Sequence, residues 1–126
     1  MTAPFVWYDV TAPAAEADSV RDFYGKLLGW TIAPDTNPGP YNGWITDGDQ
    51  PWASVIEADG ATAGRWIPYV QVDDLDAAVS TATSLGATVV ADKADGPAGT
   101  AVTIADPAGA VLALWVPFPS RDDNQS

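Results

Sequence analysis

The order of predicted secondary structure repeats within this chain, and this repeat constrains the fold more than any single motif. Each half predicts a strand, one amphipathic helix that ends at a glycine, and three further strands. The repeat has a period of about 60 residues and lies in the element order more than in residue identity. One helix covers only one face of four strands, so the other face of each half needs a partner. The sequence therefore predicts an α+β fold of two βαβββ modules with curved mixed sheets enclosing a cleft; the alternative is an α+β sandwich without a cleft.

Module one is predicted from about residue 5 to residue 57. An apolar stripe predicts a helix that ends at Gly29. The helix begins either near Thr11, with Pro13 in its first turn, or at Asp18 as the cap of a shorter helix. The Pro-rich loop Pro34–Pro40 is either a lid over the cleft or a turn. The strands are predicted at Phe5–Val10, Trp30–Ala33, Tyr41–Thr46 and Trp52–Glu57, and the stripe comprises Val20, Phe23, Tyr24, Leu27 and Leu28.

Module two is predicted from about residue 65 to residue 118, after a small, polar linker at residues 58–64. Asp74 is a good N-cap for its helix, which Gly86 closes. A loop is expected at Asp92–Gly99. Residues 119–126 form a polar tail, and we expect its last six residues, Arg121–Ser126, to be frayed. We expect the modules to make a single domain. The strands are predicted at Trp66–Val72, Thr88–Ala91, Thr100–Ala105 and Val111–Val116, and the helical stripe comprises Leu75, Ala78, Val79, Ala82 and Leu85.

The composition excludes several kinds of chemistry. The chain has no cysteine, so a disulfide framework, a zinc-thiolate site and a cysteine nucleophile are excluded. It also has no histidine, which removes the commonest metal ligand and the commonest general base.

The chain is strongly acidic, with 5 Lys+Arg against 17 Asp+Glu and a net charge of -12. This charge disfavours nucleic acid and anionic membrane surfaces as partners. It tolerates a neutral or cationic small molecule, although acidity can also serve solubility alone. The first residues show no signal-peptide pattern, and no apolar run approaches a membrane span. We therefore expect a cytoplasmic protein.

Four stretches of the sequence resemble the glyoxalase/bleomycin-resistance/dioxygenase superfamily, also called vicinal oxygen chelate proteins. They are FVWYDV, DFYGKLLGW, WIPYVQVDDLDAAVSTATSLGA and ADPAGAVLALWVPF, and the resemblance covers about residues 5 to 118. It implies two βαβββ modules. In the enzymes of the superfamily it also implies one divalent metal, held by His and Glu side chains from the first and last strands of each module.

The matching positions in this chain are Tyr8, Ser54, Tyr69 and Ala113. None of these side chains is a carboxylate or an imidazole, and a neutral phenol or hydroxyl is a poor metal ligand. Strand alternation predicts that the nearby acidic residues, Asp9 and Glu57, point to the opposite face. The sequence therefore predicts no metal site of the usual type and no cofactor.

Alternation from these positions predicts an inward-facing set that forms an apolar and aromatic cup. Such a cup suits a flat or hydrophobic organic molecule oriented by a few hydrogen bonds. Core packing is the alternative for each aromatic residue. The inward set adds Val6, Val10 and Ile67 to the predicted ligand-binding residues, which are Tyr8, Trp52, Ser54, Ile56, Tyr69, Gln71, Val111, Ala113 and Trp115.

Three classes of function are compatible with this cup. The first is metal-independent binding of a hydrophobic or aromatic small molecule, such as natural-product or antibiotic sequestration of the drug-resistance kind. The second is a cofactor-free isomerase or cyclase acting on a natural product, with Tyr8 or Tyr69 as weak catalytic candidates; a metal-dependent glyoxalase-like or dioxygenase-like lyase requires ligands not recognised in the sequence. The third is a non-catalytic partner module. The linker permits the cup to form within one chain or between the two chains of a dimer that exchange modules. A homodimer is favoured, and a monomer is the alternative.

Overall fold

A computed structural model describes residues 4–119 of the chain, in two compact units. The N-terminal unit is Val6–Pro68, and the C-terminal unit contains Tyr69 and the described residues after it, together with Pro4 and Phe5. Two predictions concern the ends of the chain: the lack of a signal-peptide pattern at the N-terminus and the frayed C-terminal tail. Almost all of the residues that they concern lie outside the described residues. Across residues 4–119, no helix is both long enough and apolar enough to cross a membrane.

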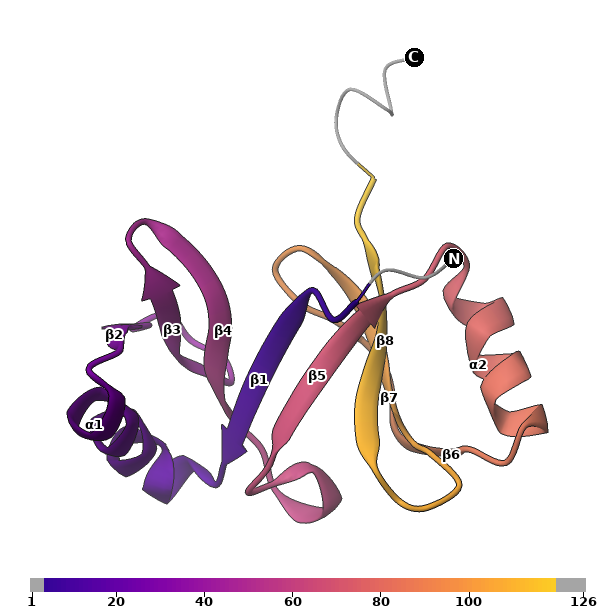
Figure 1. Ribbon diagram of the computed structural model, residues 1–126, viewed down its shortest axis with the longest axis horizontal. Coiled ribbons are helices and arrows are strands. Elements are labelled where there is room, and N and C mark those ends of the chain that lie inside the picture. The colour runs from indigo at the N-terminus through magenta and orange to yellow at the C-terminus, as the bar shows by residue number, and fades with distance from the viewer. Residues whose placement is uncertain (1–3, 120–126) are drawn as a thin grey trace. The chain divides into compact units, whose positions relative to one another are not determined.

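The N-terminal unit is a four-stranded mixed sheet with one helix on one face (Figure 1). Its strand order is β2-β3-β4-β1, in which β1 runs parallel to β4 and the other pairs are antiparallel. The predicted order of elements is therefore confirmed for this module. The elements are β1 (Trp7–Ala12), α1 (Ala17–Leu28), β2 (Thr31–Pro34), β3 (Tyr41–Asp47) and β4 (Gln50–Glu57), with single 3-10 turns at Ala14–Glu16 and Gly60–Thr62.

Helix α1 ends where the sequence predicts but begins elsewhere. Gly29 closes it with φ 71°, and the Gly29 N–H donates to the Gly25 carbonyl oxygen over 3.0 Å. Both predicted starts are wrong, because the N-cap is Glu16. A 3-10 turn after Pro13 delays the helix, and Asp18 already lies in its first turn.

Thr11 anchors the linker between the two modules instead of capping the helix. It is the fifth residue of β1, and its buried hydroxyl donates to the carbonyl oxygen of Thr62. Its N–H donates to the Arg65 carbonyl oxygen over 2.9 Å, and its own carbonyl oxygen accepts from the Gly64 N–H over 3.0 Å. Residues 62–65 are therefore fixed to β1 by backbone and side-chain hydrogen bonds.

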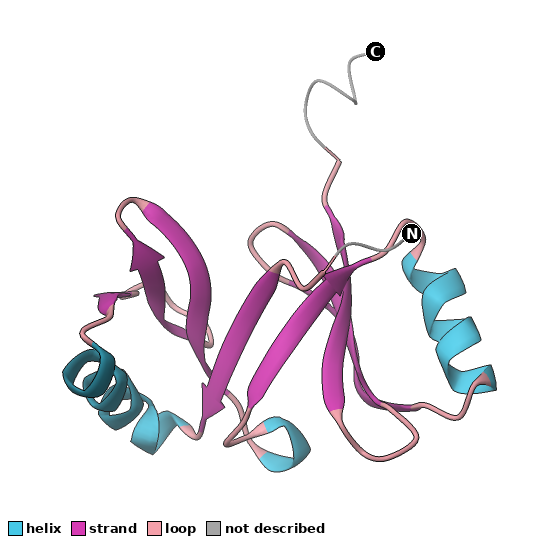
Figure 2. Ribbon diagram, in the orientation of Figure 1, coloured by secondary structure: helices cyan, strands magenta, loops and turns pink. Residues whose placement is uncertain are grey.

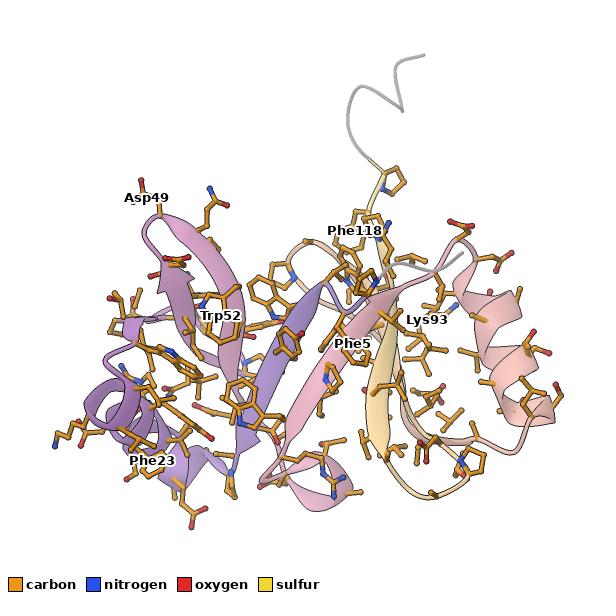
Figure 3. All side chains as sticks on the ribbon, in the orientation of Figure 1. Phe5, Phe23, Asp49, Trp52, Lys93 and Phe118 are labelled. Atoms are coloured by element: carbon orange, nitrogen blue, oxygen red, sulfur yellow. The ribbon has the colours of Figure 1, made fainter. Side chains whose placement is uncertain are left out.

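The apolar stripe of α1 is only partly used by the core. Val20 and Tyr24 pack against the buried cluster that Val10, Ala53 and Val55 form with other residues of the sheet. The rest of the stripe stays exposed, and Phe23 projects from the helix in Figure 3. The exposed fractions are 55% for Phe23, 62% for Leu27 and 50% for Leu28.

The second module repeats the arrangement with β5 (Trp66–Gln71), α2 (Leu75–Ser84), β6 (Thr88–Asp95), β7 (Gly99–Ala105) and β8 (Val111–Pro117). The first three residues of β5 fall in the N-terminal unit and the rest of the module in the C-terminal unit. Its order is β5-β8-β7-β6, and β5 pairs with β8 in parallel. Figure 2 shows its strands in magenta beside the cyan helix α2.

Two local predictions for the C-terminal unit have different outcomes. Asp74 is the N-cap of α2, and its carboxylate accepts from the Ala77 N–H over 3.0 Å, as predicted. The loop predicted at Asp92–Gly99 is wrong in its first part, because β6 continues to Asp95 through register shifts that a simple apolar pattern does not reveal.

Candidate ligand-binding face

The register of β1 and β4 decides which side chains of the N-terminal unit share a face. Asp9 is paired with Ser54, and Tyr8 is paired with Ala53. Paired residues of neighbouring strands point to the same side of a sheet, and the next pair points to the other side. Ala53 is buried in the cluster between α1 and the sheet, which we call the α1 core. Because Asp9 and Ser54 form the next pair, they lie on the face away from α1.

The prediction that Tyr8 faces the same way as Ser54 is therefore wrong. Tyr8 packs against the α1 core, and its ring contacts Trp52 edge to face, with 6.2 Å between the ring centroids. The prediction that Asp9 faces away from Ser54 is wrong for the same reason. The alternation of β1 was correct, but the assignment of its two faces was inverted.

Trp52 also lies on the α1 side, although alternation along β4 predicts the side of Ser54. The partner of Ile45 is Ala53 and the partner of Thr46 is Pro51, so Trp52 is an extra residue in β4. Such a bulge turns a side chain away from its expected face. The Trp52 ring, labelled in Figure 3, contacts Trp30 with 5.0 Å between the ring centroids.

Asp9 accepts hydrogen bonds from two side chains on the face away from α1. Asp9 is only 3% exposed. The Ser54 hydroxyl donates to Asp9 Oδ1, and the Trp7 indole N–H donates to the same oxygen over 3.1 Å. The indole N–H also points to Ser54 Oγ at 3.3 Å. A carboxylate at this depth is stabilised by such donors, because burial without them is costly.

Three aromatic side chains stand beside this carboxylate. Trp44 is paired in register with Ser54. Its ring contacts the Trp7 ring edge to face, with 6.2 Å between the ring centroids. Tyr41 stacks on Trp44 with 4.8 Å between the ring centroids and 13° between the ring planes. All three side chains are half-buried, so each keeps some surface open to solvent. We call the surface of Trp7, Asp9, Tyr41, Trp44 and Ser54 the Asp9 face.

Tyr41 is held in its neutral form on this face. Burial raises the pKa of Tyr41 to about 12, and the negative charge of Asp9 adds to the increase. The phenol therefore stays protonated at neutral pH and can donate a hydrogen bond.

The start of the loop after β2 is attached to the same aromatic residues. The Trp44 indole N–H donates to Asp35 Oδ2 over 3.0 Å, and the Asn37 N–H donates to Asp35 Oδ1 over 2.8 Å. The Asp35 N–H donates to the Asn42 carbonyl oxygen over 3.0 Å. The alternatives of a lid and a simple turn for Pro34–Pro40 both stay predictions.

The predicted face of the C-terminal unit has the expected register. Tyr69 is paired with Ala113, and Gln71 with Trp115. Val70 and Leu114, which lie between these two pairs, pack in the buried cluster that contains Leu75 of α2. The Tyr69–Ala113 and Gln71–Trp115 pairs therefore lie on the face away from α2. Alternation places Val111 with Ala113, and in the N-terminal unit Ile56 with Ser54. A binding role for these residues stays a prediction.

The donors on these faces do not fit a divalent metal ion. In the N-terminal unit the face that carries Ser54 offers one carboxylate, that of Asp9, and its Oδ1 already accepts two hydrogen bonds. In the C-terminal unit the corresponding pair is a phenol and the methyl group of Ala113. A dication needs three or four nitrogen or oxygen donors. Among the described residues, no three Asp, Glu, His or Cys side chains come close enough to hold one.

Two surface depressions lie elsewhere in the N-terminal unit. One, of about 540 Å³, is lined by Asp18, Arg21, Lys26 and other residues of α1, and by Trp30 and Ile32. The other, of about 620 Å³, lies between Trp30, Trp52 and the polar end of the β3–β4 hairpin. Both have largely polar or charged rims, which suit a flat apolar ligand poorly.

Sequence reasoning missed four residues of the Asp9 face, namely Trp7, Asp9, Tyr41 and Trp44. Alternation that starts from Trp7 instead of Tyr8 groups Trp7, Asp9 and Thr11. The family's ligand positions instead assign Tyr8 to the inward face, and the pairing of Tyr8 with Ala53 contradicts that assignment.

The comparison with known families agrees with this fold. Residues 9–115 match the model of the glyoxalase-like domain. The chain belongs to this glyoxalase-like family. The predicted membership of the superfamily is thereby confirmed.

Relatives of this glyoxalase-like chain include longer proteins. CFP32 of Mycobacterium tuberculosis, whose name contains the word glyoxylase, is 32% identical over 118 residues, which cover 86% of this chain and 44% of CFP32. The anthracycline biosynthesis protein DnrV of Streptomyces peucetius is 29% identical over 127 residues, covering 86% of this chain and 45% of DnrV. The chain thus spans less than half of the length of these curated relatives.

Solved structures share the fold at lower identity. The Mn(II)-bound glyoxalase from Novosphingobium aromaticivorans has a TM-score of 0.59 and 14% identity, covering 91% of this chain and 39% of that one. At this identity the likeness establishes the fold alone.

Proposed function

We propose that this glyoxalase-like chain binds a flat aromatic or hydrophobic small molecule on the Asp9 face without a metal ion. The observation that carries the proposal is the stacked pair of Tyr41 and Trp44 next to the buried Asp9 and Ser54 side chains. Aromatic surfaces with a few fixed polar groups are typical of sites for organic ligands.

The chemistry of the donors supports binding without a metal. One carboxylate with hydrogen-bond donors around it is a poor site for a dication but a good acceptor for an organic donor group. The name of DnrV connects one relative to the biosynthesis of an antibiotic. A polycyclic natural product is therefore the class of ligand that we propose, with sequestration as the activity.

Tryptophan fluorescence tests this proposal directly. The full chain, treated with EDTA, is titrated with a panel of flat polycyclic aromatic compounds. We expect saturable quenching by at least one compound, and weaker binding to Trp44→Ala. Trp52→Ala is the matched control, because Trp52 lies on the α1 side. Absence of saturable quenching across the panel, or equal binding by both variants and the wild type, would contradict the proposal.

The cofactor-free enzyme is a second candidate, and one observation favours it. Asp9 supplies the acid–base group that the predicted cup lacked, and the neutral Tyr41 phenol lies near it. Tyr8 loses its proposed catalytic role, because it packs on the α1 side. If the chain turns over a bound compound, Asp9→Asn should abolish turnover more strongly than it weakens binding, and equal losses would argue for binding alone.

A further inference from the structure

Asp9 is the only charged side chain among the buried residues that the structure describes. Ser54 and Trp7 both donate hydrogen bonds to its Oδ1. An ionised carboxylate accepts hydrogen bonds and donates none. The chemistry at the base of the Asp9 face therefore selects groups that carry N–H or O–H.

The Trp7 indole N–H occupies this acceptor site through a weak interaction. Its hydrogen is shared between Asp9 Oδ1 at 3.1 Å and Ser54 Oγ at 3.3 Å. Both distances are at the long end for an N–H donor. A cationic donor makes a shorter and stronger hydrogen bond to a carboxylate than a neutral one does. Because Trp7 is half-buried, its indole can be displaced at lower cost than a fully packed side chain.

We infer that the ligand of the Asp9 face carries an ammonium group on an aromatic body, and that this group replaces the Trp7 N–H at Asp9. This inference rests on the proposed function and names its class of ligand. The stacked rings of Tyr41 and Trp44 contact the aromatic body, and the nearby indole rings favour a cation. The net charge of -12 attracts cations toward the chain as a whole.

The test compares 1-naphthylmethylamine with 1-naphthalenemethanol, two probes that share one ring system and differ in the charge of the donor. Both are titrated into the full chain at neutral pH, with tryptophan fluorescence as the readout. The amine should bind about 10-fold tighter than the alcohol. Asp9→Asn should bring the two affinities together, whereas Asp49→Asn removes a charge at the exposed hairpin tip and should keep the difference (Figure 3).

Trp7→Phe keeps an aromatic ring but removes the competing N–H, and it tests the inference even if Asp9→Asn does not fold. It should tighten binding of the amine by about 3-fold or more. An unchanged or weaker amine affinity in Trp7→Phe would overturn the replacement of the indole.

The two levels of the proposal fail in different ways. Equal affinities of the amine and the alcohol for the wild type, unchanged in Asp9→Asn, would overturn the inference and leave the proposed function standing. Absence of saturable binding by both probes and by the wider aromatic panel would remove both.

Discussion

The Ser54 hydroxyl donates a hydrogen bond to Asp9 Oδ1 across the parallel pair of β1 and β4, on the face away from α1. Ser54 is fully buried and Asp9 is 3% exposed. The bond therefore joins two strands at a depth where water cannot easily replace either partner.

Removal of this donor should destabilise the chain. Ser54→Ala leaves the buried Asp9 carboxylate with one hydrogen bond fewer, which should lower the free energy of unfolding by about 1–3 kcal/mol. Urea denaturation measures the change. Ser80→Ala, on the exposed side of α2, is the control and should stay within about 0.5 kcal/mol of the wild type. Equal, small effects of both substitutions would show that the Ser54–Asp9 bond adds nothing to stability.

Tyr41 should titrate later than an ordinary tyrosine. Its pKa of about 12 lies above the ordinary tyrosine value of 10.0, because burial and the charge of Asp9 both disfavour the phenolate. Phenolate absorbance of the wild type minus that of Tyr41→Phe should rise near pH 12. A difference curve centred near pH 10 would contradict the burial of Tyr41.

The same shift predicts a dependence of stability on pH. Between the unfolded value of 10.0 and the folded value of about 12, the folded state keeps the Tyr41 proton that the unfolded state has lost. The contribution of Tyr41 to stability is therefore complete below pH 10 and decreases as the pH rises through this window. Tyr41→Phe should show a smaller decrease over the same window in chemical denaturation; an identical decrease would assign it to other groups.

Gly99 should tolerate no side chain. A Cβ atom at residue 99 would lie 2.1 Å from the Val116 carbonyl oxygen and 2.6 Å from Trp115 Nε1. Gly99→Ala must push β7 and β8 apart locally, so we expect a loss of about 1–3 kcal/mol or more in the free energy of unfolding.

Gly25 offers the matched control for Gly99. It lies inside α1, and a Cβ atom there would meet only the Trp30 carbonyl oxygen at 3.7 Å. Gly25→Ala should raise stability by about 0.5–1 kcal/mol, since alanine favours the helix. If Gly99→Ala were as stable as Gly25→Ala, the close approach of Trp115 and Val116 would be refuted.

Trp52 should matter for stability and not for ligand binding. It packs edge to face on Trp30 and against the α1 core. Trp52→Ala should therefore cost about 2 kcal/mol or more of folding free energy, measured by thermal or urea denaturation. The affinity for an aromatic probe should stay within about 3-fold of the wild type. A large loss of affinity with little loss of stability would restore Trp52 to the ligand site.

The sequence predicted the fold well because its signals are local. The period of the apolar residues, the glycine at the end of α1 and the Asp74 cap each depend on a few neighbouring residues. The start of α1 was missed because the 3-10 turn after Pro13 has no distinct sequence pattern.

The candidate site was predicted less well because it depends on pairing between strands. Alternation along β1 separates Tyr8 from Asp9 but does not say which of them faces α1; the pairing with Ala53 and Ser54 decides that. The bulge at Trp52 shifts one residue of β4 and is also a property of the pairing. On β5 and β8 the register of Tyr69 with Ala113 and Gln71 with Trp115 is regular, so alternation predicted their shared face correctly.

The central claim, binding of an aromatic ligand without a metal, is tested most directly by calorimetric titration of 1-naphthylmethylamine into the full, EDTA-treated chain. The titration is then repeated after addition of Mn²⁺ or Zn²⁺. We predict saturable binding with the same Kd in all three conditions. Binding that appears only after a metal ion is added would contradict this account.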